Sequence, residues 1–96
     1  MRKSYVYILA SERNGTLYIG VTSDLVKRIY EHKNNLVDGF TKTHKLHNLV
    51  YYEAFDSIED AIVREKQLKN GSRAKKMELV CAFNPEWIDW YEKILS

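Results

Sequence analysis

Apolar and polar residues alternate in short stretches of this chain, and three of these stretches predict β-strands. They are residues 5–10, 16–22 and 49–55. The first two flank Asn14-Gly15, which is a strong hairpin signal. The pattern therefore predicts a β-hairpin at the N-terminus and a third strand later in the chain.

The hairpin decides which side chains share a face of the sheet. A two-residue loop at Asn14-Gly15 and a four-residue loop at residues 11–14 give different strand pairings. In both pairings Tyr7 and Tyr18 lie on the same face, because side chains alternate with a period of two residues along each strand. A loop that contains a bulge would break this relation.

Capping signals predict four helices around these strands. The helices begin at Ser23 or Asp24, at Ser57, at Ser72 and at Asn84. Gly71 suits the left-handed position that ends the second helix, the third ends near Phe83, and the fourth runs to the C-terminus. Residues 37–48 are predicted to form a polar loop.

The predicted order is strand, strand, helix, strand and then three helices. It indicates an α/β fold of the α+β type, in which helices flank a three-stranded, partly antiparallel sheet. The length of 96 residues predicts one domain over residues 1–96. The apolar run at residues 5–10 is too short for a signal peptide or a membrane span. A lone cysteine, Cys81, cannot form an internal disulfide and is expected in the core, so we predict a cytoplasmic protein.

Charged side chains fall on the apolar faces of two predicted helices. Arg28 and His32 share the stripe that contains Leu25, and Glu65 shares the stripe that contains Ile62. Burying an ionised carboxylate costs several kcal/mol unless it is compensated. Two partners for Glu65 are open: a salt bridge with Arg28, which the spacing alone favours, or a hard cation such as Mg²⁺.

Basic residues cluster in the second half of the chain, although the net charge is only +2. Between Arg64 and Lys76 there are six basic residues and one acid. The cluster predicts contacts with nucleic-acid phosphates, and a solvated lysine-rich helix face is the alternative. The candidate contacts are Lys42, Lys45, Lys66, Lys69, Arg73, Lys75 and Lys76.

Four segments together resemble the GIY-YIG nuclease superfamily. The segments YVY at 5–7 and YIG at 18–20, separated by ten residues, resemble its paired signature. SDLVKRIYEHK, at 23–33, resembles the helix that bears an arginine, and DAIVREKQLKN, at 60–70, resembles the helix that bears a glutamate. The chain is similar to the small stand-alone bacterial members of the superfamily.

The resemblance implies metal-dependent hydrolysis of nucleic-acid phosphodiester bonds. Tyr7 and Tyr18 match the two motif tyrosines, and Arg28 matches the catalytic arginine. Glu65 matches the ligand of a single Mg²⁺ or Mn²⁺ ion, and His32 matches a position that is Tyr or His among relatives. Arginine can meet the charge that builds on phosphoryl oxygens. Either Tyr18 or His32 takes the proton from water.

Three residues depart from the family pattern. Tyr5 stands where the first motif has glycine, Val6 conservatively replaces its isoleucine, and Val21 follows YIG where some members carry lysine. Relatives usually gain specificity from an attached DNA-binding module, so here the basic residues or a protein partner would supply it. The leading hypothesis is an endonuclease acting on DNA. The alternatives are an inactive nucleic-acid-binding module of the same fold and a structural domain held by an Arg28–Glu65 salt bridge.

Overall fold

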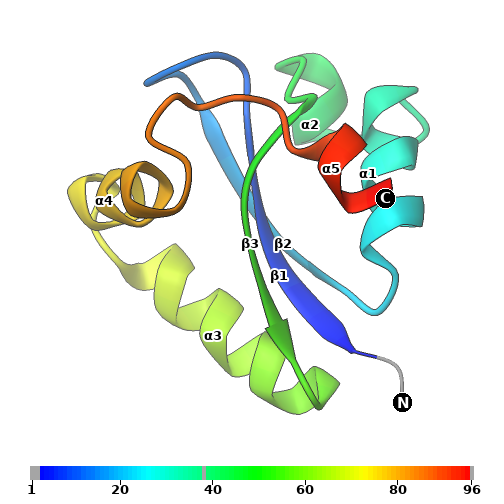
Figure 1. Ribbon diagram of the computed structural model, residues 1–96, viewed down its shortest axis with the longest axis vertical. Coiled ribbons are helices and arrows are strands. Elements are labelled where there is room, and N and C mark those ends of the chain that lie inside the picture. Colours follow the sequence, from blue (N-terminus) through cyan, green and yellow to red (C-terminus); the bar gives the residue numbers. More distant parts are fainter. Residues whose placement is uncertain (1–2, 38, 96) are drawn as a thin grey trace.

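The computed structural model describes residues 3–37 and 39–95, in which three strands form one antiparallel sheet (Figure 1). The strands are β1 (Ser4–Ala10), β2 (Leu17–Thr22) and β3 (Asn48–Phe55). The helices are α1 (Leu25–Lys33), α2 (Phe40–Thr43), α3 (Ile58–Asn70), α4 (Arg73–Phe83) and α5 (Tyr91–Leu95). The strand order is β2-β1-β3, which confirms the predicted α+β fold.

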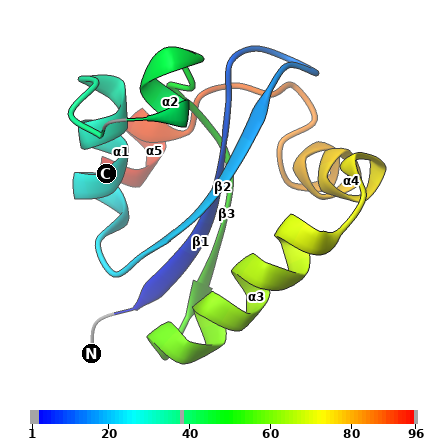
Figure 2. The same cartoon turned by 180° about the vertical axis from the view of Figure 1, so that it is seen from behind.

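Helices cover both faces of the sheet. Helices α1, α2 and α5 lie on one side, whereas α3 and α4 lie on the other (Figures 1 and 2). Alternate residues of β1 enter two separate cores: Val6 and Ile8 pack toward Ala61, while Tyr7 and Leu9 pack on the opposite face. Because β1 is the central strand, both of its faces are buried, which explains its continuous apolar run.

The loop between β1 and β2 is longer than either predicted loop. Ala10 pairs with Leu17, so residues 11–16 form the connection and both predicted registers are wrong. The Ser11 hydroxyl accepts a hydrogen bond from a backbone N–H across the loop at 3.1 Å. Asn14 has a φ of 58° and turns the chain inside this wider loop, instead of forming a two-residue turn.

The predicted relation between the two tyrosines is nevertheless confirmed. The observed pairing sets Tyr7 opposite Gly20, which shifts each predicted register by two residues. A shift of two residues leaves every side chain on its original face. The rings of Tyr7 and Tyr18 accordingly lie on one face, with centroids 6.4 Å apart.

Three of the predicted helix starts are confirmed. The side chains of Asp24, Ser57 and Ser72 each accept a hydrogen bond at 3.2 Å from the backbone N–H three residues later. The left-handed conformation predicted for Gly71 is wrong, because its φ is −78°. Only Gly71 and Ser72 separate α3 from α4, and both are extended, so the chain passes directly into the next N-cap.

The helix predicted to begin at Asn84 is wrong, since α5 begins only at Tyr91. The Asn84 side chain is buried, and its Nδ2 donates to the backbone oxygens of Val50 at 3.3 Å and Ile88 at 2.7 Å. The bond to Val50 ties this segment to β3. Tertiary hydrogen bonds thus hold residues 84–90 out of the helix that the Asn-Pro cap signal favours.

Two further expectations are corrected. The segment 37–48 contains the short helix α2, and Thr41 and Leu46 within it are buried, so it is more than a polar loop. Cys81 is exposed on α4, outside the core. In the described part of the chain, no helix is both long and apolar enough to cross a membrane.

Candidate active site

A buried hydrogen-bonded chain links β1, α1 and α2. The Tyr7 hydroxyl lies 3.0 Å from Nε2 of His32, and Nδ1 of His32 lies 3.1 Å from the Thr41 hydroxyl. Only 2% of Tyr7, 2% of His32 and 4% of Thr41 are exposed. His32 lies on the buried face of α1 with Leu25 and Ile29, as its spacing predicts. Protein neighbours therefore occupy both ring nitrogens of His32.

Burial sets the protonation states in this chain. Desolvation, helped by the charge of Arg28, lowers the pKa of His32 to about 4. Desolvation also raises the pKa of the Tyr7 hydroxyl far above its usual range. At neutral pH His32 is therefore a neutral imidazole and Tyr7 keeps its proton. Because a neutral imidazole has one donor and one acceptor nitrogen, His32 donates to one neighbour and accepts from the other.

Tyr7 leaves no room for a side chain at Gly20, its partner on β2. A Cβ atom at Gly20 would lie 2.4 Å from both Cζ and Oη of Tyr7, far inside contact distance. A glycine in a strand commonly marks such a close approach. The packing of the Tyr7 ring thus gives the physical reason for the glycine in the YIG segment.

Tyr18 is the half-buried member of the same aromatic cluster. Its ring centroid lies 5.8 Å from that of His32 and 6.4 Å from those of Tyr7 and Phe40. Tyr18 also lines an open groove of about 380 Å³ at the β2 edge of the sheet. Tyr7 and His32 do not line this groove, so Tyr18 is the ring that connects the buried chain to it.

Arg28 lies one turn before His32 on α1, with 40% of its side chain exposed. Its guanidinium is 3.5 Å from the carboxylate of Glu31, one turn along α1. Such a long, partly exposed ion pair is weak. The charge of Arg28 lowers the pKa values of both Tyr7 and His32, so it acts on the buried chain.

Glu65 approaches the same region from α3, on the other side of the sheet. Its side chain is 16% exposed, and its carboxylate lies 3.4 Å from the ammonium of Lys69. The predicted Arg28–Glu65 salt bridge is wrong, since each residue pairs within its own helix. Glu65 raises the pKa of Tyr7, so its charge reaches the phenol that Arg28 also affects.

The lysines predicted to bind nucleic acid lie in several places. Lys69 and Lys76 line the groove beside Tyr18. The other predicted lysines do not line this groove. Lys42 lies on α2 and Lys45 just after it, whereas Lys66 lies on α3 and Lys75 on α4. Two of the predicted basic contacts therefore lie beside the aromatic cluster.

Arg73 has a structural contact that its sequence position does not predict. Its guanidinium donates to the backbone oxygens of Asn14 at 2.8 Å and Gly15 at 2.6 Å. These bonds tie the start of α4 to the β1–β2 loop. Arg73 thus helps to fix the hairpin, whatever contact its exposed surface makes with phosphate.

Three residues of the site were missed by sequence reasoning: Thr41, Phe40 and Glu31. The pairing of Glu31 with Arg28 was visible as an i,i+3 spacing on a helix. Thr41 and Phe40 gave no such signal, because helix α2 has only four residues and its surroundings are polar.

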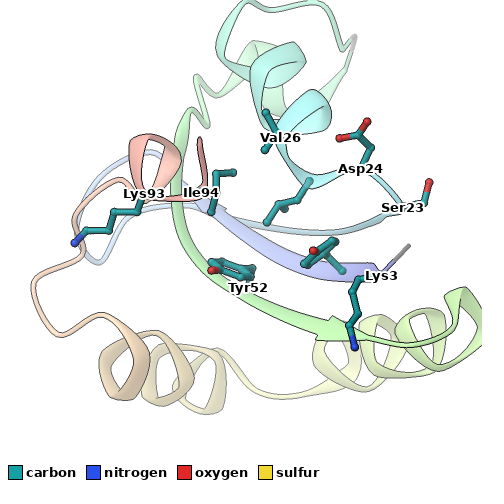
Figure 3. A pocket seen from close by; sticks show the side chains of 9 residues that line it. Lys3, Ser23, Asp24, Val26, Tyr52, Lys93 and Ile94 are labelled. Atoms are coloured by element: carbon teal, nitrogen blue, oxygen red, sulfur yellow. The ribbon is translucent and has the colours of Figure 1, made fainter. Parts of the chain in front are cut away.

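A separate pocket of about 400 Å³ lies where the start of α1, the middle of β3 and α5 meet (Figure 3). Lys3 and Lys93 line it, and both are engaged: Lys3 pairs with Asp56, and Lys93 lies 5.0 Å from the centre of the Trp90 ring. No residue predicted for the site lines this pocket. Tyr18, Lys69 and Lys76 line the groove at the β2 edge instead, and Arg28 lines another hollow, of about 300 Å³, with Glu31.

Known proteins are similar to this chain over most of its length. The GIY-YIG catalytic domain family matches residues 3–78. The chain is 40% identical to the UPF0213 protein of Staphylococcus saprophyticus over 80 residues, which cover 83% of this chain and 96% of that protein. It is also 40% identical to the UPF0213 protein of Syntrophus aciditrophicus over 87 residues, covering 90% of this chain and 98% of that one.

A solved structure has the same fold. The solution NMR structure of the UPF0213 protein from Bacillus halodurans matches with a TM-score of 0.56 at 34% identity, covering 88% of this chain and 89% of that one. The family match at residues 3–78 spans the aromatic cluster, Arg28 and Glu65. The chain therefore belongs to the GIY-YIG family, which is part of a nuclease superfamily.

Proposed function

We propose that this chain is a metal-dependent endonuclease that hydrolyses nucleic-acid phosphodiester bonds, with DNA as the expected substrate. The observation that carries the proposal is the contact of Tyr18 with the Tyr7–His32 pair at the rim of a groove. Arg28 and Glu65 both act electrostatically on this cluster. Together these groups cover the needs of proton transfer, phosphate binding and cation coordination.

Within this proposal, Tyr18 takes the proton from the attacking water. His32 is unsuited to that role, because both of its ring nitrogens are engaged and its pKa of about 4 makes it a weak base. Tyr7 is buried and holds its proton. Tyr18 borders the groove that a substrate would enter. His32 and Tyr7 are then positioning residues that fix the place of the Tyr18 ring.

Arg28 is the group that meets the phosphate charge in this proposal. Its planar fork of donors suits two phosphoryl oxygens, and negative charge on those oxygens grows as water attacks. The long contact with Glu31 is easily exchanged for a stronger bond to phosphate. Arg28 also brings a positive charge to the cluster, which opposes the rise in the pKa of the buried Tyr7 hydroxyl.

Glu65 is the residue that would hold the metal ion. No group of three or more His, Cys, Asp or Glu side chains forms a cage within residues 3–37 and 39–95. A single carboxylate still fits Mg²⁺, which keeps several waters and takes oxygens from substrate phosphates. Lys69, now paired with Glu65, is half exposed and free to turn away. The ion, when bound, would stabilise negative charge on the phosphate and the leaving oxygen.

Cleavage of a panel of DNA and RNA oligonucleotides in Mg²⁺ or Mn²⁺ tests the proposal. The wild-type chain should cut at least one substrate, and Glu65→Gln and Arg28→Ala should each slow cleavage by about 100-fold or more. Glu59→Gln is the matched control, because Glu59 is an exposed glutamate in the first turn of the same helix. If the wild type binds every substrate and cuts none, the chain is a binding module and the enzyme proposal fails.

A further inference from the structure

A groove lies at one edge of the sheet beside Tyr18. Strand β2 forms this edge, and the groove of about 380 Å³ lies within the usual size range of ligand sites. Helix α2 stands on one side of the sheet, and α3 and α4 on the other (Figures 1 and 2). The lining residues are Leu17, Tyr18, Ile19, Phe40, Lys69 and Lys76.

Aromatic rings form one wall of this groove. Phe40 is 47% exposed, although phenylalanine is usually buried. Its ring lies 4.2 Å from the ring of His44 and 6.4 Å from that of Tyr18, to which it is inclined by only 25°. Phe40 therefore contacts Tyr18, the proposed general base, and the exposed His44. Nearly half of Phe40 still remains accessible, and accessible ring surface is where a planar group can stack.

Positive charge lines the opposite wall. Lys69 and Lys76 come from α3 and α4, and the described lining contains no carboxylate. Glu65 lies nearby, paired with Lys69 at 3.4 Å. A wall of aromatic rings facing a wall of ammonium groups matches the two parts of a nucleotide, a planar base and an anionic phosphate.

We propose that this groove is a base-stacking subsite, in which Phe40 stacks an unpaired nucleobase and Lys69 and Lys76 contact the phosphates of the same strand. The proposal rests on the proposed nuclease function for the identity of the polyanion. A base inside a duplex is already stacked on both sides, so only an unpaired or extruded base can use Phe40. The substrate is therefore single-stranded, or locally unpaired, at the position that enters the groove.

A peptide strand is the competing occupant, because an edge strand offers unpaired backbone groups for pairing. Strand addition would need neither the aromatic rings nor the two ammonium groups. The charge complementarity of the groove with a polyanion therefore favours nucleic acid.

Binding measured without turnover separates this subsite from cleavage. Fluorescence anisotropy in EDTA would compare a labelled single strand of about 12 nucleotides with a duplex of the same number of phosphates. Phe40→Ala should weaken binding of the single strand by about 5- to 150-fold and leave duplex binding within about twofold, whereas Phe40→Trp should retain binding. Tyr30→Ala, which removes an exposed tyrosine from α1 outside the groove, is the matched control.

A second measurement changes the nucleic acid. Removing one base at a time from the single strand should weaken wild-type binding at the position that stacks, and the same lesion should have no effect in Phe40→Ala. Lys69→Ala and Lys76→Ala should weaken single-strand and duplex binding alike and reduce its dependence on salt.

The subsite is overturned if Phe40→Ala changes single-strand and duplex binding by the same factor, or changes neither. It is also overturned if a peptide binds the groove while nucleic acid does not. These outcomes are independent of cleavage. A wild type that cuts DNA without any Phe40-dependent preference keeps the nuclease and loses the subsite. A wild type that stacks bases on Phe40 but cuts nothing keeps the subsite and loses the nuclease.

Discussion

The replacement Gly20→Ala tests the packing that holds the Tyr7 ring in the site. Gly20 is buried opposite Tyr7, and the added Cβ would lie 2.4 Å from Cζ and Oη of that ring. Neither atom can yield cheaply, because the hydroxyl is bonded to His32 and the ring is only 2% exposed. The variant must therefore displace the phenol, break its hydrogen bond or shift the strand.

Overpacking of this kind costs about 1–3 kcal/mol. The free energy of unfolding, measured by urea titration, should fall by that amount, which at an m-value of roughly 1–3 kcal/mol/M lowers the midpoint by about 1 M. Gly71→Ala is the matched control, because a Cβ there meets only ordinary contacts at 3.4 Å and φ is −78°. The control should be neutral or slightly stabilising.

A double-mutant cycle identifies the cause of this loss. In a Tyr7→Leu background the clash partner is gone. Gly20→Ala should then lower the free energy of unfolding by only about 0.5 kcal/mol, instead of the 1–3 kcal/mol expected when Tyr7 is present. If Gly20→Ala costs no more than Gly71→Ala, or costs as much with Tyr7→Leu as without it, the Tyr7 ring does not hold the position described and the reasoning fails.

Three further predictions concern the same region and its supports. The pKa of His32 is about 4 in the fold and about 6.5 when unfolded, so protonation favours the unfolded chain, and the free energy of unfolding should fall by up to about 3 kcal/mol as the pH drops from 6.5 to 4. Urea titrations across this range should show a smaller fall for His32→Gln. Thr41→Val leaves a buried ring nitrogen unpaired and should lower the free energy of unfolding by about 1–3 kcal/mol, whereas Thr43→Val on the same helix should change it little. Arg73→Ala removes two bonds to the β1–β2 loop and should cost about 1 kcal/mol and speed amide exchange in that loop, an effect that Lys75→Ala should lack.

Local chemistry made much of this fold predictable. Asp24, Ser57 and Ser72 cap helices through bonds to their own neighbours, so their role can be read without knowing the tertiary structure. The shared face of Tyr7 and Tyr18 was predictable for a different reason. It depends only on whether the register shifts by an even or an odd number of residues. The predicted loop lengths were wrong, but the resulting shift of two residues kept both side chains on one face.

The missed features depend on partners far away in the sequence. Asn84 resembles a helix cap, but its side chain bonds to Val50 on β3. Thr41 is buried and hydrogen-bonded to His32, which lies nine residues earlier, and no propensity or period marks the short helix that carries it. Arg28 and Glu65 were expected to pair because both lie on inward stripes, yet spacing along a helix does not show that α1 and α3 cover opposite faces of the sheet (Figure 1).

Single-turnover cleavage by the wild type and Tyr18→Phe, each with Mg²⁺ and at saturating protein, tests the central claim most directly. The account predicts that the wild type cuts a nucleic-acid substrate, that Tyr18→Phe slows the cut by about 100- to 10,000-fold, and that both bind the substrate equally well. His32→Gln should retain more activity than Tyr18→Phe, because its ring positions Tyr7 and does not meet the water. A Tyr18→Phe variant that cuts as fast as the wild type would contradict the account, and so would a wild type that binds every substrate without cutting any.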